Sequence, residues 1–246
     1  MFAVTVSAFA ETVTAMAFGT EMTIGRGPSP GLQGATGYRL AFQTAVKAGL
    51  AGTGTTLDMV GRNSAGVRSE SFDTDWEGQE GPAFRVHGLA GSMGSILAPY
   101  PGLDFLLLTD IILWDAFFGA TPTSLVSDVS AVLDAVHVIS PGTVIVIGTS
   151  SGDIFKSPSY QAYNSILTTA VRGMSWVTLV DLNVFPSSSF LSQLLLNQPA
   201  QNHVGELMAQ ATLPHINSSP VPLPPAVLLL ASALFGLVVV RRRSRI

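Results

Sequence analysis

The sequence has 246 residues, of which 47% are hydrophobic and only 11% charged, enough for one α/β domain with a full core and additional terminal segments. The net charge is −4, and four of the 12 basic residues fall among the last six positions, which argues against a nucleic-acid-binding protein. Because cysteine is absent and the four histidines show no paired spacing, we expect neither disulfides, thiol catalysis, a metal site nor another cofactor.

The first ten residues resemble part of a targeting segment. Residues 1–10 are small and apolar and end in Ala8-Phe9-Ala10 before Glu11, which is similar to the cleavage site of a signal peptide. We therefore expect residues 1–10 to be a partial signal peptide. An ordinary first strand is the alternative.

Strands and helices are predicted to alternate between residues 11 and 214. Apolar and β-branched runs predict strands at 12–18, 55–60, 103–113, 143–147 and 177–180. Apolar residues at helical spacing predict helices at 37–50, 122–139, 159–172 and 202–211. This order predicts an α/β fold, a three-layer α/β/α sandwich with a five-stranded parallel sheet and its site at the carboxyl ends of the strands.

The segment after the first strand carries a family resemblance. It reads Gly-Thr-Glu-Met-Thr-Ile-Gly over residues 19–25, and it resembles the first block of the SGNH (GDSL-type) hydrolases, Gly-Asp-Ser-Ile-Thr-x-Gly. Glu21 then stands at the position of the nucleophilic serine. A Gly-Tyr-Arg segment at 37–39 and a Leu-Asp-Met-Val-Gly segment at 57–61 resemble further family segments in the same order.

The same resemblance implies where the other site residues lie. Gly81 takes the position of the oxyanion-hole glycine, and Trp114 takes that of the oxyanion-hole asparagine. Asn197 takes the position of the triad aspartate, and Ala200 that of the triad histidine.

The family implies hydrolysis of acyl esters, including those of carbohydrates, without a cofactor. Glu21 is a weak nucleophile towards esters, and no imidazole stands at Ala200, so we expect activity to be weak or lost. The alternative is a non-catalytic module that binds a glycan or an extracellular-matrix polymer.

A second serine pattern provides a further alternative. Residues 148–152 read Gly-Thr-Ser-Ser-Gly after a strand, and Ser150, Asp181 and His203 follow the Ser–Asp–His order of α/β-hydrolases. Against this reading, residues 153–158 separate the pattern from the next helix.

Acidic residues near the presumed site allow another alternative, a glycosidase that uses a pair of carboxylates. Solvated charges in loops explain these acids more simply. They are Glu21, Glu77, Glu80, Asp110 and Asp115.

The C-terminal residues form a three-part tail. Residues 221–225 read Val-Pro-Leu-Pro-Pro, residues 226–240 are apolar, and an arginine cluster follows at 241–245. The apolar run is shorter than the about 20 residues of a spanning helix, but the proline segment lengthens it, and the arginines should stay cytoplasmic.

This tail resembles the PEP-CTERM (VPLPA-type) sorting signal of Gram-negative bacteria. The resemblance implies an exosortase-type partner, transient anchoring in the inner membrane, and a final location at the cell surface or outside the cell. We expect a domain at 11–214, a linker with the proline motif at 215–225 and a transmembrane sorting segment at 226–246. A plain membrane anchor is the alternative, and it leaves the prolines unexplained.

Overall fold

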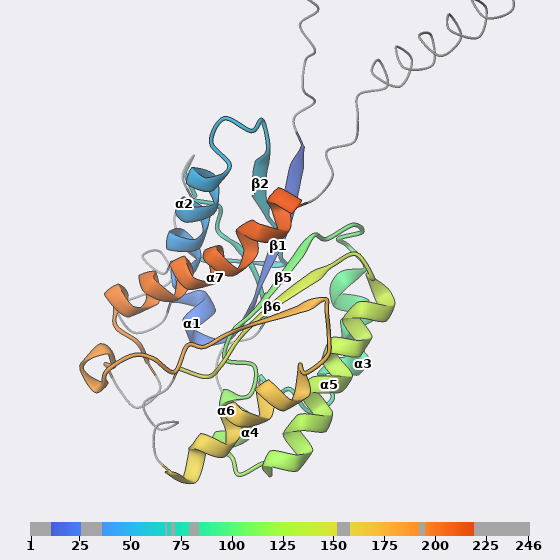
Figure 1. The fold of residues 1–246 in the computed structure, drawn as a ribbon, viewed down its shortest axis with the longest axis vertical. Coiled ribbons are helices and arrows are strands. Elements are labelled where there is room, and N and C mark those ends of the chain that lie inside the picture. Colours follow the sequence, from blue (N-terminus) through green and yellow to red (C-terminus); the bar gives the residue numbers. More distant parts are fainter. Residues whose placement is uncertain are drawn as a thin grey trace, which may run out of the picture.

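The computed structural model describes residues 11–25, 36–66, 68–69, 72–78, 84–151, 158–191 and 195–218. Helices cover both faces of a central sheet (Figure 1). Helices α2 (Arg39–Gly49) and α7 (Gln198–Ser218) pack on one face. Helices α3 (Leu89–Leu97), α5 (Pro122–Ile139) and α6 (Pro158–Ala170) pack on the other. The predicted three-layer α/β/α architecture is confirmed. The expected signal peptide, the sorting segment and Gly81 lie outside the described residues.

Strand β1 (Thr12–Gly19) is central, and the sheet order is β3-β4-β1-β5-β6-β7, with β2 also paired to β1. All five predicted strands are present and parallel: β2 (Thr56–Met59), β1, β5 (Phe105–Leu108), β6 (Val144–Gly148) and β7 (Val177–Val180). Within the described residues the sheet has seven strands, however, because β4 (Asp75–Gly78) runs parallel to the end of β1 and β3 (Asn63–Ser64) pairs antiparallel with β4.

These two additional strands were not predicted, since the sequence pattern indicates neither strand nor helix between residues 61 and 102. Their sequences, Asn-Ser and Asp-Trp-Glu-Gly, have little β propensity. The backbone of β4 pairs with the end of β1, where Phe18 and Gly19 are the partners of Glu77 and Gly78, and this pairing stabilises the extended conformation. Tertiary pairing therefore decides their conformation.

The apolar run at 103–113 was also misread, because its strand ends at Leu108. Asp110 then adopts a left-handed conformation with φ 54°, and the short helix α4 (Leu113–Phe117) follows. Ile111, Ile112 and Leu113 are as deeply buried as the strand itself. Hydrophobicity alone cannot separate a buried strand from a buried turn, which explains the error.

Two helices also differ from their predictions. Helix α3 was not expected, since its sequence is rich in Gly and Ser. Helix α7 begins at Gln198 and continues to Ser218, so residues 215–218 of the expected linker are helical.

The side chains of β1 alternate between two hydrophobic clusters, one on each face of the sheet. Met16 and Phe18 pack towards α3, α5 and α6, whereas Ala15 and Ala17 pack towards α2 and α7. Burial on both faces is typical of a central parallel strand. This packing fixes the strand that carries the candidate site at its carboxyl end.

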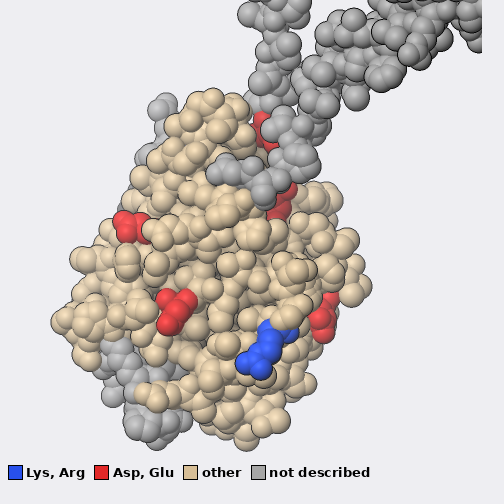
Figure 2. Space-filling model, in the orientation of Figure 1, with Lys and Arg blue, Asp and Glu red and all other residues tan. Residues whose placement is uncertain are grey.

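Among the described helices, only α5 is long and apolar enough by composition to cross a membrane. Its apolar stripe, however, packs against the sheet through Leu125, Val129, Val132, Leu133 and Val136. Thr121 caps the helix by accepting a hydrogen bond from the Ser124 backbone N–H, and Pro122 occupies the first turn, so the helix begins where the sequence predicted it. Figure 2 shows few and scattered charges on the face it draws.

Candidate functional site

Three segments meet at the carboxyl edge of the sheet. Helix α1 (Glu21–Ile24) follows β1, the turn at Asp110 follows β5, and residues 149–151 follow β6. The hydroxyls of Thr23 and Thr109 are 2.7 Å apart, and the Ser151 hydroxyl donates to Met22 Sδ over 3.7 Å. Open parallel α/β sheets bind ligands at this edge.

Gly19 permits this close approach. A Cβ at position 19 would lie 2.4 Å from both the Thr109 carbonyl oxygen and Thr23 Oγ1. No side chain fits such a gap, so only glycine lets the end of β1 pack against α1 and the turn after β5. Gly19, which also matches the family block in the sequence, is therefore required in this chain for steric reasons.

Glu21 is the first residue of α1 and is only 8% exposed. Its Oε2 accepts a hydrogen bond from the indole Nε1 of Trp114 over 3.1 Å. Trp114 belongs to α4, and 93 positions separate the two residues. The structure therefore brings together the predicted nucleophile position and the predicted oxyanion position.

Asp110 adds a second buried carboxyl group to the same edge. The residue is 3% exposed, and a backbone hydrogen bond from Ser151 reaches its carboxyl group. Burial, and secondarily the charge of Glu21, raise the pKa of Asp110 from its ordinary value to about 7. Near neutrality this carboxyl group therefore carries a proton for much of the time. The sequence signal was one of two acids, with Asp104, inside the apolar run at 103–113.

The buried side chain of Arg39 connects α1 to neighbouring segments through hydrogen bonds. The side chain is fully buried, and its Nε donates to the Thr23 carbonyl oxygen over 2.8 Å. Its two terminal nitrogens donate to the carbonyl oxygens of Thr74 (2.6 Å) and Ala65 (2.9 Å). Burial lowers the pKa of Arg39 to about 10. The arginine of the Gly-Tyr-Arg segment thus joins α1 to the residues around β3 and β4.

No protein-family model matches the sequence, and a comparison with curated proteins finds no match. Solved structures do match. A family 3 carbohydrate esterase from Clostridium thermocellum superimposes with a TM-score of 0.62 at 19% identity, over 85% of this chain and 98% of that one. A family 3 carbohydrate esterase from Talaromyces cellulolyticus gives a TM-score of 0.60 at 14% identity, over 83% and 96%. A G-D-S-L lipolytic protein from Veillonella parvula gives 0.52 at 13%, over 84% and 99%.

The fold is that of the SGNH (GDSL-type) esterases. At these identities the likeness concerns the fold.

Two further residues that the resemblance predicts to match triad positions lie at the start of α7. Asn197 Oδ1 accepts a hydrogen bond from the Ala200 backbone N–H over 3.0 Å, and its Nδ2 donates to the Ser188 carbonyl oxygen over 3.2 Å. Ala200 is buried in the core between α2 and α7. Gln198 donates to the Gly37 carbonyl oxygen over 3.5 Å, which ties this end of α7 to the segment that packs on α1. Asn197 thus caps a helix of the SGNH fold.

The alternative serine site has different contacts from those of a triad. The Ser150 backbone is held by the Asn164 side chain at 2.9 and 3.0 Å, and its buried hydroxyl has no hydrogen-bond partner in the described part of the chain. Asp181 accepts from the Thr149 hydroxyl over 3.1 Å. His203 is half exposed and lies 3.2 Å from Glu206. The contacts of Asp181 and His203 are thus made with residues other than Ser150.

Two other acids near this edge have structural partners. Glu77 pairs with Arg62 at 2.8 Å. Asp115 accepts a hydrogen bond from the Val86 backbone N–H over 2.7 Å, and burial raises the pKa of its carboxyl group. These contacts hold β4 and α4 in place within the SGNH fold.

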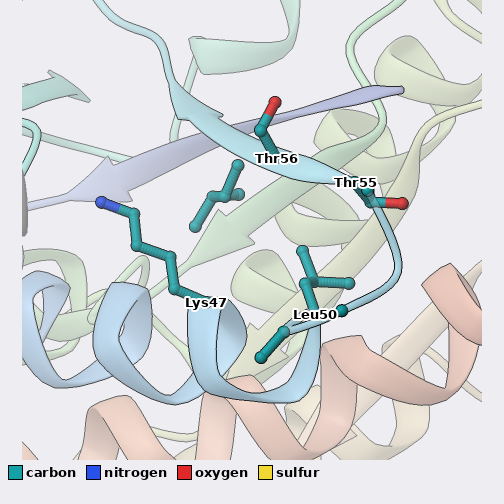
Figure 3. Close-up of a pocket in the computed structure, with 8 residues that line it drawn as sticks. Lys47, Leu50, Thr55 and Thr56 are labelled. Carbon is teal, nitrogen blue, oxygen red and sulfur yellow. The ribbon is translucent and has the colours of Figure 1, made fainter. Parts of the chain in front are cut away.

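A cavity of about 490 Å³ lies elsewhere, between the end of α2 and the start of β2 (Figure 3). Lys47, Leu50, Thr55 and Thr56 line it, and no acid or histidine is among its lining residues. Thr56 pairs with Thr12, so this cavity lies at the amino edge of the sheet, opposite Glu21. We therefore place the candidate site at the carboxyl edge on chemical grounds.

Proposed function

We propose that this chain is an exported protein with the SGNH-esterase fold that binds a glycan at its carboxyl edge and hydrolyses esters weakly or not at all. The observation that carries the proposal is the carboxylate of Glu21 at the tip of β1, bonded to the indole of Trp114. A carboxylate that attacks an ester forms an anhydride, which is less stable than the ester consumed. The nucleophile position therefore favours binding over acyl transfer.

The state of the other SGNH-equivalent positions supports the same conclusion. Ala200 offers no imidazole to accept a proton, and the Asn197 side chain is used as a helix cap. Removing a catalytic triad typically lowers kcat by about a million-fold, leaving only the contribution of the rest of the site. Trp114 also fills space at the position implied for an oxyanion donor.

A glycan is the ligand class that the neighbours suggest. Two of the similar structures are described as family 3 carbohydrate esterases. If the ancestral site recognised an acylated carbohydrate, loss of the nucleophile would leave recognition of the carbohydrate as the remaining function. We extend this ligand class to the present chain as part of the proposal.

The positions of the first and last described residues of the domain are compatible with surface sorting by the C-terminal tail. His215 of α7 lies 3.0 Å from Thr178 of β7, and a small cavity of about 80 Å³ is lined by Glu11, Asp104 and His215. Both ends of the described domain therefore lie at the amino edge of the sheet, away from Glu21 (Figure 1). We propose that the segment at 226–246 anchors the chain in the inner membrane until an exosortase-type enzyme processes it, with the site directed away from the bilayer.

The test compares hydrolysis and binding in the purified full chain. We expect p-nitrophenyl acetate hydrolysis at background in the wild type, in Glu21→Ala and in Ser150→Ala, together with retardation in native gels that contain a soluble polysaccharide. Turnover in the usual range of about 1–10³ s⁻¹ that disappears in Ser150→Ala would overturn the proposal and favour the Ser150 esterase. Deleting residues 226–246 should abolish membrane fractionation, and unchanged fractionation would contradict the sorting role.

A further inference from the structure

Helix α4 and the residue after it carry three aromatic rings beside Glu21, which we term the aromatic platform: Trp114, Phe117 and Phe118. The centroids of Phe117 and Phe118 are 5.5 Å apart, and Trp114 lies 5.7 and 6.1 Å from them. Phe117 is 44% exposed and Phe118 54% exposed. Exposed neighbouring aromatic rings at the edge of a candidate site indicate a contact surface.

Contacts with Glu21 and Arg85 hold the platform in place. The Trp114 indole is bonded to Glu21, and the Arg85 guanidinium lies 4.2 Å from the centre of the Phe118 ring. Arg85 also donates to the Trp114 carbonyl oxygen over 3.4 Å. Such contacts limit the rotation of the rings before any ligand arrives, which lowers the entropy lost on binding.

We propose that the aromatic platform is a stacking subsite for the pyranose rings of a neutral polysaccharide. The inference deepens the proposed function and rests on it. A pyranose presents an apolar C–H face that fits an aromatic ring, and hydroxyls at its rim that fit a guanidinium or a carboxylate. The platform offers the same combination, since its rings lie beside the Arg85 guanidinium and the Trp114–Glu21 pair.

The charges around the aromatic platform favour a neutral polysaccharide over an acidic one. The cation beside the platform is Arg85. Because Asp115 lies 3.9 Å from its guanidinium, the positive charge of Arg85 is already balanced by a carboxylate. The adjoining Glu21 is acidic, and the whole chain carries a net charge of −4. A polyuronate would therefore meet repulsion with little compensation.

The experiment measures retardation of the full chain in native gels that contain hydroxyethylcellulose, xylan or polygalacturonate. We expect the wild type to be retarded by a neutral polysaccharide, and its tryptophan fluorescence to change as Trp114 is covered. The double variant Phe117→Ala/Phe118→Ala should bind at least ten-fold more weakly. Leu191→Ala is the matched control, because Leu191 is also 54% exposed and apolar, and it should bind like the wild type.

Each other outcome overturns a defined part of the argument. If the wild type binds a neutral polysaccharide and the double variant binds equally well, the platform is not the subsite while the proposed function stands. If none of the three polysaccharides binds, both fall. Binding to polygalacturonate alone overturns the choice of a neutral chain. A change from dimer to monomer on gel filtration of the double variant would show that the platform contacts a second copy of this chain instead. Equal thermal unfolding of wild type and variants excludes misfolding as the cause.

Discussion

The indole Nε1 of Trp114 donates a hydrogen bond to Oε2 of Glu21 over 3.1 Å. The family resemblance in the sequence predicts that these two positions match an oxyanion donor and a nucleophile, which act on opposite ends of the same substrate carbonyl. In this chain they bind each other. The contact joins α1 to α4 and couples the carboxyl edge of the sheet to the aromatic platform.

This contact is expected to stabilise the fold. A hydrogen bond to a charged group contributes about 1.5–3 kcal/mol, so a double-mutant cycle of Trp114→Phe and Glu21→Ala should give a coupling free energy of about 1–3 kcal/mol. The four free energies of unfolding are measured by urea titration. Additive effects of the two substitutions would contradict a direct interaction.

Trp176 provides the control for this cycle. Its buried indole Nε1 has no hydrogen-bond partner in the described part of the chain. A cycle of Trp176→Phe with Glu21→Ala should therefore give a coupling free energy within about 0.5 kcal/mol of zero.

Asp110 should make stability depend on pH. Its pKa in the folded state is raised to about 7, whereas the unfolded chain has an ordinary value near 3.8. Between these values the folded state binds the proton more tightly, so this group lowers the free energy of unfolding as the pH rises from about 4 to about 7. Three units of pKa correspond to at most about 4 kcal/mol.

Asp110→Asn should remove this dependence. Asparagine suits the left-handed backbone at φ 54°, so the variant should be more stable than the wild type at pH 8 and nearly equal to it at pH 4. Asp134→Asn, on the exposed side of α5, should change stability equally little at both pH values. An identical effect of Asp110→Asn at pH 4 and pH 8 would refute the assignment.

The sequence predicted the fold better than the site. The five parallel strands were found because each lies within an apolar run, and helices α2, α5, α6 and α7 followed from their 3.6-residue period. Strands β3 and β4 were missed because pairing with β1 stabilises them against their own propensity. The end of β5 was missed because its following turn is as buried as the strand.

Within the site, the sequence located Glu21 and Trp114 but not their contact, because no spacing rule links residues on different elements. Asp110 was noted only as one of several acids in presumed loops. Its burial depends on the turn after β5 and on Ser151 from the next crossover, and neither is visible in local pattern. The predicted roles of Asn197, Ala200 and Ser150 stay predictions, whereas their contacts are now described.

The close packing at Gly19 gives a third prediction. Gly19→Ala should destabilise the protein by about 1–3 kcal/mol or more, because the new Cβ would collide with Thr109 and Thr23. Gly91→Ala is the matched control in helix α3, where a Cβ meets nothing within 4 Å. That variant should gain about 0.5–1 kcal/mol through helix propensity. Thermal and urea unfolding measure both, and equal effects would contradict the steric role of Gly19.

Arg39 gives the last prediction, since its guanidinium satisfies the carbonyl oxygens of Thr23, Ala65 and Thr74 without exposure to water. Arg39→Met should cost about 3 kcal/mol or more, because three buried acceptors lose their donors at once. Arg39→Lys should recover only part of this, because an ammonium group cannot reproduce the planar fork.

The matched control is Arg172→Met, at an exposed position after α6, and it should change the free energy of unfolding by less than about 0.5 kcal/mol. Because Arg39 holds α1 against β3 and β4, its loss should also increase hydrogen exchange at Thr23 and Ala65 before the protein unfolds globally. If Arg39→Met unfolds at the same urea concentration as Arg172→Met, then packing of α2 and α7 alone suffices to hold the carboxyl edge, and Arg39 has no positioning role there.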